Sequence, residues 1–217
     1  ELSSGALRKS ELHRVEASIE RLQGWRLPTR PEIITASSRI IDLVGEAPPA
    51  RFDLSDIATA LSRMPRYAGH TRQPYSVAQH SLMVASLVPE EHRAQALLHD
   101  ASEAYLMDMP SPIKAHFPEY REMEARAEDQ IYASFGLANW KAFKSTIKAA
   151  DRLALDAECR DLMLHAGHGS DFPMAEGIPE IKVMPAAEAA SAWLEATQDA
   201  LRCAPRERHS SLAMARM

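Results

Sequence analysis

Apolar residues recur at helical spacing along most of the chain after residue 53. The segment DLSDIATALSRM begins with a capping Asp or Ser and places Ile57, Ala60 and Leu61 on one side of a helix. Pro89 opens another helix, which we expect to run to about Met107, because proline suits a first turn. Further amphipathic or buried helices are predicted over 75–88, 119–136, 138–166 and 185–203. The pattern therefore predicts an all-α domain.

The two ends of the chain differ from this helical middle. Residues 1–30 are polar and charged, and Pro28 and Pro31 break the amphipathic stretch LHRVEASIERLQGW. The following stretch, EIITASSRIIDLVGEAPP, is β-branched and then rich in Gly and Pro, which predicts a short strand or hairpin. We therefore expect an N-terminal extension with a small hairpin (1–48), a helical domain (49–204) and a disordered tail (205–217).

Composition and charge exclude several classes of protein. The net charge of −5 argues against a general binder of nucleic acid or of anionic membranes. The two cysteines, Cys159 and Cys203, form neither a disulfide framework nor a CxxC metal knuckle, so we expect a cytoplasmic protein. The sequence has no apolar run of membrane-spanning length, no GxxxxGK[ST] phosphate loop and no GxSxG nucleophile elbow.

The stretch QALLHDASEAYLMDMPSPIK, residues 95–114, carries candidate chemistry. His99 and Asp100 directly follow the apolar pair Leu97 and Leu98, which predicts that they lie on a buried turn of the helix. A buried carboxylate without a partner is costly, so this pair needs compensation. Either a bound metal ion or a nearby arginine would offset the cost of burying the Asp100 carboxylate.

Two other predicted helices place a possible metal ligand in an apolar setting. His80 lies in SVAQHS, and Asp151 lies in KAADRLALDAE next to Leu153. Together with His99 and Asp100 they offer two imidazoles and two carboxylates, a set that suits Mn, Fe, Co, Zn or Mg. Each residue alone is more often a hydrogen-bonded core residue or part of a salt-bridged helix end. Spacing alone leaves the metal site and this structural interpretation both open.

The order H…HD…D resembles the HD-domain metal-dependent phosphohydrolases. The segments AQHSLMVA, LLHDASEAYLMDMPSPIK and IKAADRL are similar to the bacterial 5′-deoxynucleotidases and the phage dATP triphosphohydrolases. The resemblance covers about residues 50–165, and HDASE…DxPSPxK is its most specific part. It implies an HD-domain helical bundle in which His80, His99, Asp100 and Asp151 hold a divalent metal ion.

The resemblance also implies roles for residues around the metal. Glu103, one helical turn from His99, acts on the nucleophilic water, and Asp108 lies at the mouth of the site near sugar or phosphate. Arg66 contacts the phosphate, since its planar fork of donors matches phosphate oxygens. Tyr67 lines the sugar at a position where the deoxynucleotidases usually have Trp, which leaves the choice between deoxyribose and ribose open.

Two further residues are weaker candidates for binding substrate. His70 is either a phosphate donor or a loop residue. Lys114 is either a phosphate ligand or a solvated lysine in a Pro-rich loop.

The expected function is hydrolysis of 5′-deoxyribonucleoside monophosphates by metal-bound water, a hydrolase activity in nucleotide metabolism with a small-molecule nucleotide as partner. A dNTP triphosphohydrolase on the same scaffold is the nearest alternative, and Arg63, Arg66, Arg72 and Lys114 would supply the extra positive charge. A non-catalytic HD ligand-binding domain and a purely helical interaction module are alternatives of other classes. The apolar face of the last helix would suit a homodimer.

Overall fold

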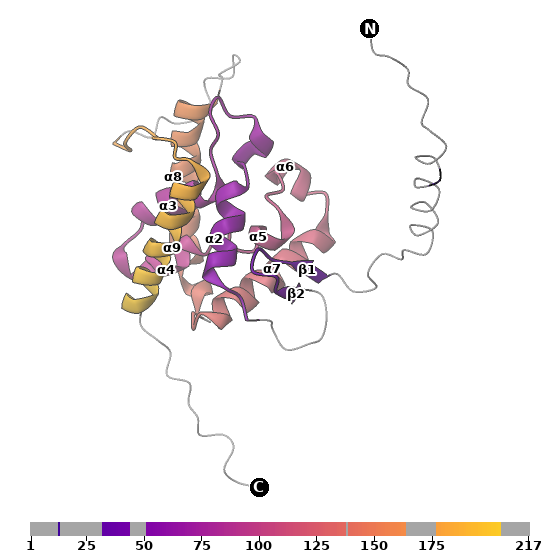
Figure 1. The fold of residues 1–217 in the computed structure, drawn as a ribbon. Coiled ribbons are helices and arrows are strands. Elements are labelled where there is room, and N and C mark those ends of the chain that lie inside the picture. Colours follow the sequence, from indigo (N-terminus) through magenta and orange to yellow (C-terminus); the bar gives the residue numbers. More distant parts are fainter. Residues whose placement is uncertain (1–12, 14–31, 44–50, 138, 164–176, 205–217) are drawn as a thin grey trace, which may run out of the picture.

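The computed structural model of the chain describes His13 and residues 32–43, 51–137, 139–163 and 177–204. Within these residues the chain is mostly helical, with one small antiparallel hairpin near its start (Figure 1). The all-α prediction and the predicted hairpin are therefore confirmed. The predicted disordered tail and nearly all of the stretch at 1–30 lie outside the described residues, so the division of the chain into three parts stays a prediction.

From α2 to α8 the helices follow one another with short connections. The α-helices are α2 (Leu54–Arg63), α3 (Val77–Ser86), α4 (Arg93–Leu97), α5 (Glu103–Leu106), α6 (Ser111–Lys114), α7 (Pro118–Ser134), α8 (Lys144–Leu162) and α9 (Ala186–Cys203). Three 3₁₀ turns are η1 (Arg66–Gly69), η2 (Glu90–His92) and η3 (Trp140–Phe143). None of the described helices is both long enough and apolar enough to cross a membrane.

The single helix predicted from Pro89 to Met107 is wrong. The chain instead forms η2 and α4, turns over residues 98–102, and continues as α5. His99 Nδ1 lies 2.7 Å from the Ala96 carbonyl oxygen and competes with the backbone for that acceptor. The backbone N–H groups of Ala101 and Glu103 then bond three residues back, to Leu98 and Asp100, which tightens the turn. His99 and Asp100 therefore lie in a turn between two helices.

The hairpin is tied to α2 by one carboxylate. Strands β1 (Glu32–Ile34) and β2 (Ile40–Asp42) pair antiparallel, with Ile33 opposite Ile41. The buried Asp56 of α2 accepts hydrogen bonds from Thr35 Oγ1 at 2.8 Å, from the Ser37 N–H at 2.8 Å and from Ser37 Oγ at 2.7 Å. These three residues form what we call the Asp56 cluster.

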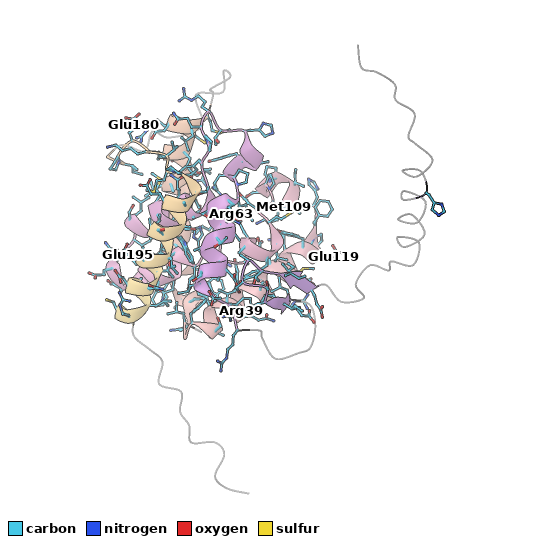
Figure 2. The ribbon with its side chains drawn as sticks, viewed as in Figure 1. Arg39, Arg63, Met109, Glu119, Glu180 and Glu195 are labelled. Atoms are coloured by element: carbon cyan, nitrogen blue, oxygen red, sulfur yellow. The ribbon has the colours of Figure 1, made fainter. Side chains whose placement is uncertain are left out.

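The core lies between α9 and the helices α2, α3 and α4 (Figure 1). Trp193 of α9 is fully buried, and its indole N–H donates to the Leu97 carbonyl at 3.1 Å. Leu97 and Leu98 are buried as well, each contributing about 1.5–3 kcal/mol relative to an exposed position. Charged side chains such as Arg39, Arg63 and Glu195 lie on the outside (Figure 2). Tertiary packing against α9 therefore fixes Leu97 and Leu98, the two apolar residues that precede His99.

Candidate metal centre

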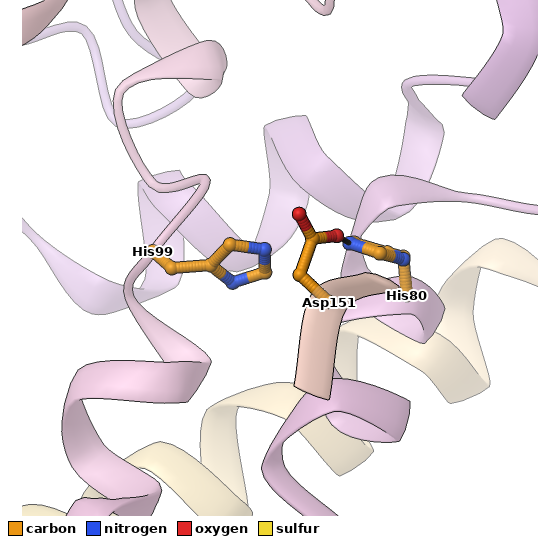
Figure 3. Close-up of side chains that lie close together, drawn as sticks. All are labelled: His80, His99 and Asp151. Carbon is orange, nitrogen blue, oxygen red and sulfur yellow. Dashed lines mark ion pairs between the residues drawn. The ribbon is translucent and has the colours of Figure 1, made fainter. Parts of the chain in front are cut away.

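Three segments bring His80, His99 and Asp151 together. His80 comes from α3, His99 from the turn after α4 and Asp151 from α8 (Figure 3). One potential ligand atom from each lies within 4.8 Å of the others. His80 Nε2 is 3.1 Å from Asp151 Oδ1. Asp100 Oδ2 is 3.1 Å from His99 Nε2 and 3.5 Å from His80 Nε2. The four residues named from the sequence therefore share one small region.

Both imidazole rings are fixed through their Nδ1 atoms. His80 Nδ1 lies 2.6 Å from Glu158 Oε1, and His99 Nδ1 lies 2.7 Å from the Ala96 carbonyl. A proton on Nδ1 leaves a lone pair on Nε2, the arrangement found in metal-ligating histidines. Both Nε2 atoms are buried, and neither has a hydrogen-bond partner within the described residues. Leaving two such atoms unsatisfied is unfavourable unless something else occupies the space between them.

The spacing of the ligand atoms fits a divalent cation. Imidazole nitrogens and carboxylate oxygens lie about 2.1 Å from a bound transition metal. Two ligands are then about 3.0 Å apart at right angles and about 3.4 Å apart at a tetrahedral angle. The nitrogen–oxygen distances of 3.1, 3.1 and 3.5 Å fall near these values. The residues present therefore fit a metal ion of this size.

The electrostatics of the cluster also favour positive charge. Burial and Arg66 lower the pKa of His80, but Glu158 and Asp151 outweigh them and raise it to about 9. Burial raises the pKa of Asp151, but the adjacent His80 imidazole, with Nε2 3.1 Å from Oδ1, outweighs burial, so that the pKa of Asp151 is lowered. The carboxylates thus stabilise a cation at this position, whether a proton on the rings or a metal ion.

Glu103, Arg66 and Asp108 adjoin the cluster. Glu103, at the start of α5, is buried, and in the part of the chain that the structure describes its Oε2 has no hydrogen-bond partner. Burial, together with the charges of Asp100 and Asp108, raises its pKa well above the ordinary value. Arg66 lies with Nη1 3.5 Å from Asp108 Oδ2 and Nη2 3.3 Å from Glu158 Oε2. Its positive charge is therefore shared between two carboxylates.

The remaining substrate candidates lie in three different environments. The Tyr67 hydroxyl donates to Glu158 Oε2 at 2.7 Å. Lys114 Nζ donates to Glu124 Oε1 at 2.6 Å. His70 is exposed, and its backbone N–H bonds to the Tyr67 carbonyl. Tyr67 is therefore linked, through Glu158, to the Nδ1 side of the His80 ring.

A pocket of about 350 Å³ opens beside the cluster. This volume lies within the range of small-molecule sites. Asp151, Lys148 and Lys144 share the side of α8 that faces it, since they are spaced three and four residues apart. The pocket is also lined by His99, Asp100, Lys114, Glu124, Glu128, Tyr132, Trp140 and Ile147.

Sequence reasoning missed Glu158 and the two lysines of α8. Glu158 follows Asp151 by seven residues, or two helical turns, and is fully buried among the small residues Ala154 and Ala157. The sequence signal available for Glu158 was an acidic residue on the same helical face as Asp151, set among apolar residues. Lys144 and Lys148 could have been found from the same spacing.

Comparison with known proteins places the chain in a family. No protein-family model matches the sequence. An uncharacterized Rhodobacter capsulatus protein is 36% identical over 138 residues, which cover 58% of this chain and 70% of that protein. The uncharacterized protein YfdR of Escherichia coli K12 is 43% identical over 126 residues, covering 58% of this chain and 68% of YfdR. This extent of similarity shows that the chain belongs to the same family as YfdR.

Proposed function

We propose that the chain is a metal-dependent nucleotide phosphohydrolase of the HD-domain type, which releases phosphate from 5′-deoxyribonucleoside monophosphates. One observation carries the proposal. Two imidazoles present buried Nε2 atoms, unpartnered within the described residues, to carboxylates at distances typical of ligands around one cation. His80, His99, Asp100 and Asp151 would hold that ion.

A divalent ion held by these residues would lower the pKa of a water ligand and so supply hydroxide near neutral pH. Glu103 is the carboxyl group suited to hold the proton of the attacking water, because it is buried with a free oxygen beside Asp100. Arg66 brings positive charge to the same region and would stabilise charge on the phosphate oxygens. Attack on phosphorus breaks the bond to the 5′ oxygen, which leaves as the nucleoside hydroxyl after gaining a proton.

One feature favours the dNTP triphosphohydrolase as a second candidate. Lys114, Lys144 and Lys148 line the pocket beside the cluster. Lys148 and Lys144 lie three and seven residues before Asp151 on one helix, about 4.5 and 10.5 Å along its axis. A row of cations leading away from the metal ligands would suit additional phosphates.

Product identification separates these functions. Deoxyribonucleoside monophosphates, ribonucleoside monophosphates and dNTPs should be tested with Co²⁺, Mn²⁺, Mg²⁺ and Zn²⁺. We expect orthophosphate release from deoxyribonucleoside monophosphates and its loss in Asp100→Ala together with bound metal. Tripolyphosphate release from dATP would instead identify the triphosphohydrolase.

The remaining outcomes discriminate the other classes. Metal binding without hydrolysis of any nucleotide would indicate a ligand-binding domain. Failure of the wild-type protein to bind any of the four metals would leave the helical interaction module. Equal rates on ribonucleotides and deoxyribonucleotides would contradict a role for Tyr67 in sugar selection.

A further inference from the structure

Glu158 is the most completely buried acidic side chain in the described part of the chain, and both of its oxygens are engaged. Oε1 lies 2.6 Å from His80 Nδ1. Oε2 accepts the Tyr67 hydroxyl at 2.7 Å and lies 3.3 Å from Arg66 Nη2. A single carboxylate therefore contacts a candidate metal ligand on one side and the turn containing Arg66 and Tyr67 on the other.

On the first side, Glu158 determines how His80 faces the cluster. A carboxylate acceptor keeps the proton on Nδ1 and so directs the Nε2 lone pair towards Asp151 and Asp100. A charged partner also makes the ring a stronger ligand than a neutral partner does. His99 has only the Ala96 carbonyl in the equivalent position, so His80 is the ring whose ligand strength depends on a distant side chain.

On the second side, Glu158 holds a strained turn. Tyr67 and Ala68 adopt left-handed backbone conformations, with φ values of +54° and +50°. Residues other than glycine keep such conformations only when surrounding contacts impose them. The Tyr67 hydroxyl and the Arg66 guanidinium both attach this turn to Glu158. The position of the turn is therefore linked to the same carboxylate that orients His80.

We propose that Glu158 is a positioning residue that couples the orientation of His80 to the orientation of the Arg66–Tyr67 turn, so that metal binding and anion binding share one buried carboxylate. The proposal rests on the proposed function for the presence of a metal and a phosphate-bearing substrate. It assigns Glu158 no contact with either of them.

The variant Glu158→Gln tests this coupling. Glutamine has the same shape, but its amide nitrogen cannot accept a hydrogen bond. Whichever way the amide lies, one of the two sides loses its acceptor and the other contacts a neutral oxygen in place of a carboxylate, so both sides are weakened. We expect Co²⁺, titrated by its visible absorption, to bind about tenfold or more weakly. We also expect inorganic phosphate to bind the Co²⁺-loaded protein more weakly, measured by calorimetry at saturating Co²⁺.

Two further variants separate positioning from loss of structure. Asp156→Asn, a change at another buried acid on the same helix, should leave both affinities unchanged. Tyr67→Phe keeps the contact between Glu158 and His80 but removes one attachment of the turn. It should retain wild-type Co²⁺ affinity and weaken phosphate binding about tenfold, as expected for loss of one hydrogen bond to a charged group.

The outcomes are distinct. A folded Glu158→Gln protein with wild-type affinity for either Co²⁺ or phosphate would overturn the coupling. Should Glu158→Gln not fold, an unchanged phosphate affinity in Tyr67→Phe would overturn it as well. If the wild-type protein itself binds no Co²⁺, the proposed function fails rather than the role of Glu158.

Discussion

Two carboxylate clusters in this molecule differ in how completely their polar atoms are hydrogen-bonded. In the Asp56 cluster, one carboxylate receives three hydrogen bonds from Thr35 and Ser37. In the second cluster, Asp100 and Asp151 lie within 3.5 Å of two histidine Nε2 atoms that have no hydrogen-bond partner among the described residues. Both clusters join segments that are distant in sequence, but Asp56 is buried, whereas the Asp151 side chain is 42% exposed.

The difference in hydrogen bonding separates a structural role from a functional one. A carboxylate whose acceptor positions are filled by protein donors is complete and stabilises the fold. A cluster that leaves buried ring nitrogens unsatisfied carries an energetic cost that a bound cation would relieve. The second cluster is therefore the one expected to bind an ion.

The largest expected effect is on metal binding. His99→Ala removes one ligand atom, and we expect Co²⁺ affinity to fall at least about a hundredfold, because metal-binding free energy is shared among few ligands. Equilibrium dialysis with metal analysis measures the change. His116→Ala, at an exposed histidine, is the matched control and should bind normally. Tight, stoichiometric Co²⁺ binding in His99→Ala would contradict the prediction that the second cluster, and not the Asp56 cluster, binds the ion.

The second-largest expected effect is a loss of stability, and it should follow from a change in the Asp56 cluster. Asp56→Ala removes the acceptor of three hydrogen bonds, and we expect the free energy of unfolding to fall by about 1–3 kcal/mol. Urea denaturation of the metal-free protein measures this loss. Co²⁺ affinity should not change, whereas Glu195→Ala on the exposed side of α9 should alter neither quantity. Weaker Co²⁺ binding in Asp56→Ala would show that the clusters are not independent.

The Asp56 effect should also depend on pH. Burial raises the pKa of Asp56, but hydrogen bonds from Ser37 and Thr35 outweigh it and bring the pKa below its ordinary 3.8. A carboxyl group whose pKa is lower in the folded state stabilises the protein above its unfolded pKa and loses this effect as pH falls through the folded pKa. The stability difference between wild type and Asp56→Ala should thus be constant near neutral pH and shrink below about pH 4. A difference that stays constant down to pH 2 would contradict this account.

The smallest effect should come from the strained turn beside the second cluster. Ala68 is exposed and has a φ of +50°, where glycine has no steric cost. Ala68→Gly should raise the free energy of unfolding by about 0.5 kcal/mol, after the greater entropy of the unfolded chain is subtracted. Ala36→Gly, at an exposed residue without a positive φ, should instead lower it. A loss of stability in Ala68→Gly would show that the turn is not strained.

The sequence predicted the local structure well where the signal was local. Periodicity and capping predicted α2, α7 and α9 to within a few residues, because a helix depends on neighbours three and four positions apart. The prediction failed between Pro89 and Met107, where the His99 side chain takes the Ala96 carbonyl and the helix breaks. The hydrophobic pattern does not reveal this competition, because Leu97 and Leu98 suit a continuous helix equally well.

The candidate site likewise has features that the sequence determines and features that only the fold determines. The sequence by itself determined which residues can act as ligands, since His80, His99, Asp100 and Asp151 are the imidazoles and carboxylates set among apolar residues. Only the tertiary structure decided that Glu158 orients His80 across 78 residues and that both Nε2 atoms lack a partner. The physical reason is that hydrogen-bond satisfaction depends on which distant groups meet in the folded core, whereas residue type and helical spacing are already present in the chain.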